Sequence, residues 1–107
     1  MSQWTVKVCA LAEPELLALP ADMRARFLHV SELLEAFGPQ EVGMPHVRPV
    51  EGKLWEMRMR GRDGIARAVY AAVHGRTLVV LHVFVKKTQA TPRAAIETAK
   101  KRLEALT

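Results

Sequence analysis

Basic side chains recur through the second half of the sequence at spacings that could gather positive charge. The arginines of this stretch include Arg58, Arg60, Arg62 and Arg67. Two adjacent lysines, Lys86 and Lys87, close a run of apolar residues. Alternate residues of a strand point to the same face of a sheet, so such a set can hold cations together over a binding cleft. A negatively charged ligand fits this arrangement, although the two lysines could also simply solubilise the end of a strand.

Charge is unevenly distributed along the chain. The 107 residues carry a formal net charge of +5, and the sequence pI is about 9.9. Between residues 58 and 76 there are five arginines and one acid, Asp63, whereas the segment from Glu13 to Glu41 holds most of the carboxylates. This asymmetry indicates a basic face, for which nucleic acid is the first candidate ligand and an acidic protein the second.

Three strands are expected to position these cations. Their predicted spans are residues 54–60, 65–74 and 77–86. The intervening segments contain Asp63-Gly64 and His74-Gly75-Arg76, which are short enough for hairpin turns. The strands should therefore form an antiparallel meander. The last strand is apolar and rich in β-branched residues almost throughout, which predicts a central position with both faces covered.

Alternation within the first of these strands separates a core face from a polar face. Trp55 points to the core with Met57 and Met59, and Glu56 points away from it with Arg58 and Arg60. Arg67 lies among apolar residues of the next strand, and a buried arginine needs a partner. It either pairs with Glu56 as a structural bridge or joins Arg58 and the lysines in a cationic bowl, and both can hold at once.

Helices are expected to cover this sheet. A short strand at residues 3–9 precedes a brief helix from Glu13 and a longer helix at about 21–37. The longer helix carries an apolar stripe of Met23, Phe27, Val30, Leu34 and Phe37.

Residues 38–52 are rich in proline and glycine and are predicted to form a loop. Thr91 should cap a helix that ends near residue 105. We predict an α+β fold: an N-terminal helical hairpin packed on a mainly antiparallel β-meander sheet with a C-terminal helix, forming a single domain over residues 1–107.

Composition argues against a disulfide, a metal site and a membrane span. Cys9 is the lone cysteine, and no cluster of Cys, His, Asp or Glu has the spacing of a metal site. The longest apolar runs fall short of the roughly 20 residues that cross a bilayer. The first residues also lack the pattern of a secretory signal. We therefore expect a cytoplasmic protein that uses no metal or other cofactor.

Four short motifs resemble those of a known protein family. They are Leu54-Trp55-Glu56-Met57-Arg58, Arg67-Ala68-Val69-Tyr70, the segment from His82 to Pro92, and Ile96-Glu97-Thr98-Ala99. In this order and at this spacing the chain resembles, over nearly its entire length, the RelE/ParE superfamily of toxins from type II toxin-antitoxin systems. Within that superfamily it is similar to the phage-related HigB-like branch.

The resemblance implies a fold, an activity and two partners. The fold would be RelE-like, with a concave basic surface on one face of the sheet. The activity would be that of a ribosome-dependent endoribonuclease, or mRNA interferase, in which a ribose 2′-hydroxyl attacks the adjacent phosphate without a metal. Such a toxin inhibits translation and growth. Its partners would be messenger RNA on the ribosome and a cognate antitoxin, often a helix-turn-helix protein of the HigA type.

Carried onto this chain, the resemblance gives residue roles. Arg58 and Arg67 would clamp the phosphate and stabilise the negative charge of the transition state, as preorganised cations do. Lys86 or Lys87 would orient the 2′-hydroxyl or protonate the leaving oxygen. Further contacts to RNA phosphates would come from Arg48, Lys53, Arg60, Arg62 and Arg93. The acid-base candidates are His82, which its apolar strand also marks as a core residue, and His46 in the predicted loop.

Two other functions remain open on the same fold. One is a ParE-like inhibitor that binds DNA gyrase and catalyses nothing. The other is a phage-derived protein that keeps only antitoxin binding. The arginines and paired lysines favour the nuclease, because a gyrase binder needs no phosphate pocket. Ala90 keeps the third function, antitoxin binding alone, open, because it stands where the family often has a lysine.

Overall fold

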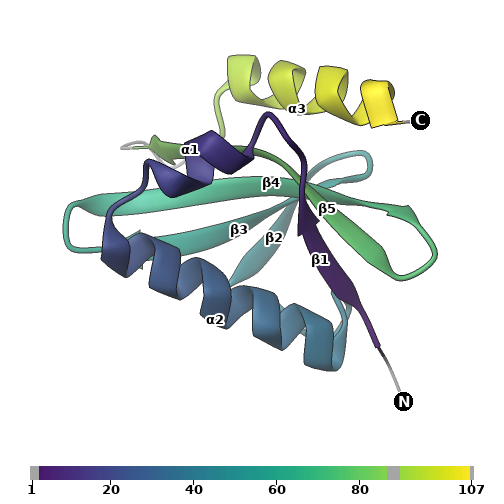
Figure 1. The fold of residues 1–107 in the computed structure, drawn as a ribbon, viewed down its shortest axis with the longest axis horizontal. Coiled ribbons are helices and arrows are strands. Elements are labelled where there is room, and N and C mark those ends of the chain that lie inside the picture. The colour runs from purple at the N-terminus through teal and green to yellow at the C-terminus, as the bar shows by residue number, and fades with distance from the viewer. Residues whose placement is uncertain (1–2, 87–89, 107) are drawn as a thin grey trace.

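A five-stranded mixed sheet with helices on both faces organises the chain (Figure 1). The computed structural model describes residues 3–86 and 90–106, and for Lys86 it describes the backbone only. The elements in chain order are β1 (Thr5–Val8), α1 (Glu13–Leu17), α2 (Ala21–Phe37), β2 (Val47–Glu51), β3 (Leu54–Gly61), β4 (Gly64–His74), β5 (Thr77–Lys86) and α3 (Arg93–Leu106). The order across the sheet is β1-β5-β4-β3-β2, with β1 parallel to β5 and the other neighbours antiparallel.

The three predicted meander strands are confirmed. Strands β3, β4 and β5 pair in antiparallel register, and their bounds agree with the expected spans to within a residue. Their turns depend on glycine, because Gly64 has a φ of 139° and Gly75 a φ of 55°, conformations that side chains disfavour. Strand β5 is internal, between β1 and β4, as its apolar run predicted.

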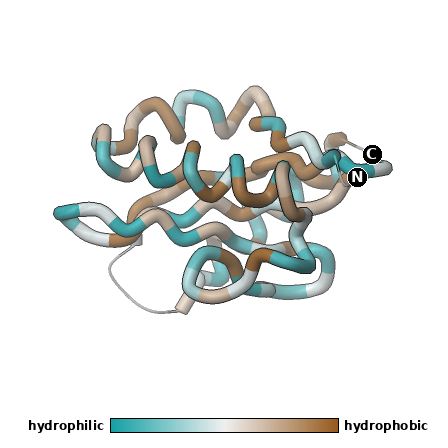
Figure 2. The backbone as a smooth tube through the Cα atoms, turned by 90° about the horizontal axis from the view of Figure 1, so that it is seen from below, coloured by the Kyte–Doolittle hydropathy of each residue, from teal (hydrophilic) through white to brown (hydrophobic). Residues whose placement is uncertain are grey.

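Helix α2 covers one face of the sheet. Met23, Phe27 and the next turns of its stripe are buried against Met57 and Met59 of β3. Trp55 also packs on this core, as its place in the alternation predicted. The stripe is one residue shorter than expected, because Phe37 is 58% exposed at the end of the helix, where Gly38 turns the chain with a φ of 84°. Figure 2 shows the amphipathic pattern as brown and teal stretches along the helices.

Helix α3 lies on the opposite face of the sheet from α2 (Figure 1). Its Ile96 and Ala99 join Leu54, Val69 and Leu81 in a second apolar cluster. The prediction that Thr91 caps this helix through its side chain is wrong. The backbone N–H groups of the first turn bond to the carbonyl of Pro92, and the Thr91 hydroxyl instead donates to a carboxylate on β3.

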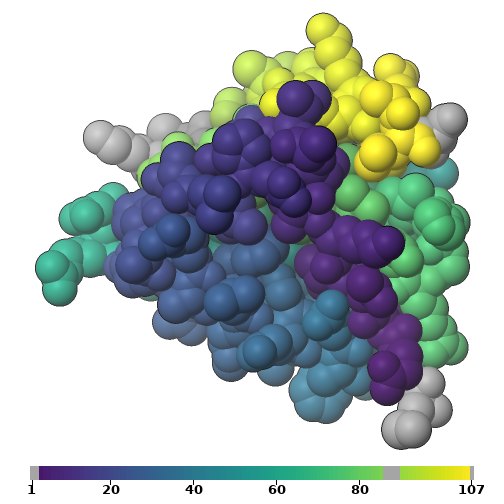
Figure 3. All heavy atoms as spheres, viewed as in Figure 1, coloured from purple at the N-terminus to yellow at the C-terminus, as the bar shows by residue number. Residues whose placement is uncertain are grey.

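The expected N-terminal helical hairpin does not form. The chain begins in the sheet, because β1 runs parallel to β5 at its edge. Helix α1 has five residues and lies against β5, whereas α2 lies against β3, so the two helices do not pair with each other. A single helical turn offers too little apolar surface to pack on a long neighbour. In Figure 3, β1, α1 and α2 occupy the middle of the face in view, α3 lies above them, and the β3–β4 turn projects at the left.

Strand β2 lies inside the segment that was predicted to be a loop. Val47, Arg48 and Pro49 pair with Met57, Glu56 and Trp55 of β3. Proline lacks the N–H that a central strand needs, and it is tolerated here because β2 is at the edge of the sheet. The density of proline and glycine around it hid the strand. Its presence matters for function because it brings the residues that precede it against β3.

Candidate functional site

A basic pocket opens where β3, β4, α2 and the residues before β2 meet. Its volume is about 230 Å³, and it is lined by Arg26, Pro45, His46, Arg58, Arg60 and Ile65. Arg58 and Arg60 share a face of β3 because they are two residues apart. The backbone N–H of Arg58 donates to the carbonyl of His46 at 2.8 Å, which fixes the turn before β2 beside the strand.

The arginines that line this pocket form no ion pair within the described ranges, and the nearby charge of Glu56 offsets only part of the repulsion on Arg58. Among residues 3–86 and 90–106, Arg26, Arg58 and Arg60 take part in no ion pair. The Nε of Arg58 is buried and has no hydrogen-bond partner within the same ranges. Burial lowers the pKa of Arg58 from its ordinary value, and the neighbouring charges of Arg67 and Arg48 lower it further. An anion bound in the pocket would relieve the repulsion among these guanidinium groups.

A buried ion-pair network supports the floor of the site. Glu56 has no exposed surface, and its Oε2 accepts hydrogen bonds from Arg67 Nη1 at 2.5 Å and Arg48 Nε at 2.7 Å. The other carboxylate oxygen accepts one from the Thr91 hydroxyl at 2.5 Å. Arg67 is 1% exposed. Of the two roles considered for Arg67, the bridge to Glu56 is therefore present, and its guanidinium lies beneath the surface that a ligand would touch.

Other residues expected to bind RNA are spread over several surfaces. The exposed Arg62 is in the β3–β4 turn, where its backbone N–H donates to Asp22 at 2.7 Å. Lys53 lines a different, mostly apolar hollow together with Trp55 and Tyr70. The structure does not bring Arg62 or Lys53 into the basic pocket.

Arg93 is at the start of α3 and is held by two carboxylates. It donates to Glu51 at 2.7 and 3.0 Å and to Glu97 at 2.8 and 3.1 Å. These bonds raise the pKa of Arg93, and together with Lys100 they lower that of Glu51 to about 2. Arg93 therefore ties α3 to the end of β2, away from the basic pocket.

The lysine pair is only partly within the described residues. The backbone of Lys86 pairs with Ile65, which lines the pocket, so β5 ends beside the site. Lys87 lies outside the described residues. The sequence-based role for these lysines remains a prediction.

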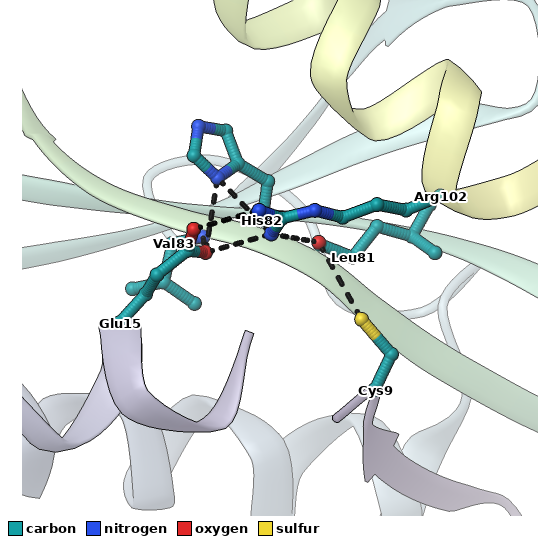
Figure 4. Close-up of polar contacts among 6 residues, drawn as sticks. All are labelled: Cys9, Glu15, Leu81, His82, Val83 and Arg102. Atoms are coloured by element: carbon teal, nitrogen blue, oxygen red, sulfur yellow. Dashed lines mark hydrogen bonds and ion pairs between the residues drawn. The ribbon is translucent and has the colours of Figure 1, made fainter. Parts of the chain in front are cut away.

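The two histidine candidates occupy different places. His46 lines the pocket, and its ring meets the ring of His29 edge-on, with centroids 6.0 Å apart. His82 is in a separate cluster, shown in Figure 4, in which Glu15 of α1 and Arg102 of α3 converge on β5. The Nδ1 of His82 lies 3.0 Å from Glu15 Oε1, and its ring stacks on Phe84. His82 is thus satisfied within the fold, as its apolar strand predicted.

The Glu15 cluster holds three elements together. The Oε1 of Glu15 accepts hydrogen bonds from the backbone N–H of Val83 at 3.0 Å and from Arg102 Nη1 at 2.9 Å. Arg102 Nη1 also donates to the carbonyl of Leu81, which accepts a weak bond from Cys9. Burial alone would raise the pKa of Glu15, but the bonds from Arg102, Val83 and His82 outweigh it and lower the pKa.

Sequence reasoning missed Arg26. It occupies the polar side of α2, where charged residues are common and carry no functional signal. Only the packing of α2 against β3 brings Arg26 to the pocket, and no motif in the sequence marks that geometry.

In the part of the chain that the structure describes, no group of three or more His, Cys, Asp or Glu side chains is placed to hold a metal ion. Within the same part, every helix is too short or too polar to cross a membrane.

Comparison with known protein families identifies the class of the chain. A profile of the family described as Phage derived protein Gp49-like (DUF891) matches residues 14–104. Because this match covers most of the sequence, the chain belongs to the Gp49-like family. A comparison with curated protein sequences gave no match.

Among solved structures, the chain is similar to the archaeal RelE-RelB complex from Pyrococcus horikoshii OT3. The identity is 24%, the aligned region covers 79% of this chain and 96% of that chain, and the TM-score is 0.53. At this level of identity the likeness shows the fold. The chain therefore has a RelE-like α+β fold, and the sequence-based fold class is confirmed at that level.

Proposed function

We propose that this protein is the toxin of a type II toxin-antitoxin pair and that it cleaves messenger RNA on the ribosome. The observation that carries the proposal is the pocket in which Arg26, Arg58 and Arg60 gather without carboxylate partners among the described residues, beside His46. Membership of a phage-derived family and a fold similar to that of RelE support it. Within the superfamily, the motifs around Arg58 and Arg67 favour a HigB-like toxin.

The proposed reaction is attack of a ribose 2′-hydroxyl on the adjacent phosphate. Arg58 and Arg60 would bind the non-bridging oxygens and stabilise the charge that develops there, which is the role that a metal ion plays in other nucleases. Arg67 would act through Glu56 and Arg58, because its own guanidinium is buried. Lys86 or Lys87 would approach the ribose from the end of β5.

The proposed partners follow from the same function. Messenger RNA would be presented by the ribosome, which places the toxin in the cytoplasm. A cognate antitoxin, helix-turn-helix and HigA-like, would neutralise the toxin. The similar archaeal structure is titled as a complex of RelE with RelB, which supports an antitoxin partner without specifying its type.

Induced expression in a bacterial host tests the proposal. Wild-type protein should arrest growth, and sequencing of RNA ends should find cuts in translated messages that vanish when initiation is blocked. The Arg58→Ala variant should allow growth and leave the messages intact. Coexpression of the reading frame next to the gene should restore growth if it encodes the antitoxin. Growth arrest with intact messages and altered DNA supercoiling would instead indicate a gyrase inhibitor and would contradict the nuclease.

A further inference from the structure

Helix α2 contributes one polar residue to the basic pocket and a second that contacts the pocket lining, although its sequence predicted only a role in packing. Arg26 lines the pocket directly, and His29 contacts the ring of His46, which also lines it. Arg26 and His29 are three residues apart, so they lie on the same side of the helix one turn from each other. Both side chains are exposed.

His46 is held in position by its backbone and by His29. Its N–H donates to the carbonyl of Gly43 at 3.0 Å, and its own carbonyl accepts the bond from Arg58. Its ring is half-buried, with an interplanar angle of 73° to the ring of His29. Histidine is a common general acid or base in enzymes, so an imidazole that lines a pocket together with three arginines is suited to proton transfer.

We propose that α2 completes the catalytic site: Arg26 binds the substrate phosphate, His46 accepts the proton of the 2′-hydroxyl, and His29 positions the His46 ring. This inference rests on the proposed ribonuclease function and assigns the proton transfer that the strand residues leave open. Arginines are poor proton acceptors because they remain protonated at any physiological pH. Among the described residues that line the pocket, His46 is the side chain with the chemistry of a general base.

The reaction balances with these groups. A neutral His46 imidazole takes the 2′-hydroxyl proton as the bond between O2′ and phosphorus forms. The bond between phosphorus and O5′ breaks, and the leaving oxygen takes a proton from water. The products are a 2′,3′-cyclic phosphate and a 5′-hydroxyl, and His46 returns its proton to solvent. Arg26, Arg58 and Arg60 stabilise the charge on the non-bridging oxygens throughout.

The test is single-turnover cleavage of a short messenger RNA on purified ribosomes, measured from pH 5.5 to 8.5. We expect His46→Ala to cleave about 10²–10⁴-fold more slowly, the contribution typical of one acid-base group. Added imidazole should restore part of its rate. We expect His29→Ala to change the pH profile and the maximal single-turnover rate constant, while leaving the protein concentration that gives half of the maximal rate close to that of wild type. Arg26→Gln should raise the protein concentration that gives half of the maximal rate, and should make this concentration less dependent on salt.

Matched controls separate these roles from general effects. Arg24→Gln removes an exposed arginine from the same helix, and His74→Ala removes an exposed histidine from the end of β4. Both should cleave like wild type. Folding of every variant is checked by thermal unfolding. If His46→Ala is folded and cleaves at the wild-type rate, or if imidazole gives it no rescue, the inference is overturned and the ribonuclease function stands. If wild-type protein leaves ribosome-bound RNA intact, the ribonuclease function fails as well.

Discussion

Arg58 lies directly opposite Arg67 in the β3–β4 ladder, and Glu56, two residues before Arg58, forms the ion pair with Arg67. Like charges directly across an antiparallel pair normally destabilise a sheet. Here one cation is buried and compensated by a carboxylate, while the other faces the pocket. The sheet can therefore present Arg58 to a ligand without burying two uncompensated charges.

The Glu56 network gives a first prediction about stability. In Glu56→Gln, the buried Arg67 loses its carboxylate partner, and removing one member of a buried pair typically costs about 3–5 kcal/mol. Urea unfolding should show a loss of that size. The double variant Glu56→Gln/Arg67→Met removes both charges and should recover part of the loss. The loss of unfolding free energy in the double variant can be compared with the sum of the losses in the two single variants. If the double variant loses more than that sum, Glu56 does not act mainly as the partner of Arg67.

Close packing of α2 against the β3–β4 turn gives a second prediction. A Cβ at Gly61 would lie 2.7 Å from the Cγ of Met23 and 2.9 Å from Asp22 Oδ2. Gly61→Ala should therefore destabilise the protein by about 1–3 kcal/mol, as overpacking does. Gly43→Ala is the control, because a Cβ there would meet no atom within 4 Å. Equal unfolding midpoints for the two variants would show that Met23 and Asp22 move aside at little cost.

The part of the fold that sequence could predict is the part set by local pattern. The alternation around Arg58 and the glycine turns determined the strands and the face on which Arg58 and Arg60 lie. The pairing of Arg67 with Glu56 was one of two roles that burial of an arginine allowed. These features depend on residues that are close in sequence or on adjacent strands.

Features that depend on packing between distant segments could not be predicted. Strand β2 was hidden by Pro49, since only its edge position makes a proline acceptable there. Arg26 reaches the pocket and His29 reaches the ring of His46 because α2 packs across β3. The exposed positions of the two residues carry no periodic signal. Whether His46 or His82 faces the site also depended on tertiary contacts, namely the bond from Arg58 to His46 and the ring contacts of His82 with Glu15 and Phe84.

A third prediction concerns pH and the Glu15 cluster. The pKa of Glu15 lies below its ordinary value of 4.5, so the unfolded state binds its proton more readily than the folded state does. The contribution to stability is fully present above pH 4.5 and is lost as the pH falls through the lower folded pKa. At pH 7, Glu15→Gln should reduce the free energy of unfolding by about 2 kcal/mol, since it weakens hydrogen bonds to charged groups.

Unfolding measured between pH 3 and 7 checks this prediction. The difference between wild type and Glu15→Gln should shrink as the pH falls below 4.5. Glu13→Gln is the matched control, because Glu13 is an exposed carboxylate of the same short helix. A difference that stays constant across this range would mean that ionisation of Glu15 does not stabilise the fold.

A fourth prediction tests whether Arg58 binds phosphate, apart from any cleavage. The affinity for a short single-stranded RNA, measured by fluorescence anisotropy over a salt series, should fall in Arg58→Ala. The slope of log affinity against log salt should become shallower by about 0.7 for one lost phosphate contact on a single strand.

Lys7→Ala is the matched control. It removes the same charge from an exposed position of β1, which lies at the other edge of the sheet from β2. It should leave the slope unchanged, because a charge that touches no phosphate releases no counterion. Equal losses in the two variants would mean that RNA responds to net charge alone, and the pocket around Arg58 would then have no special part in binding.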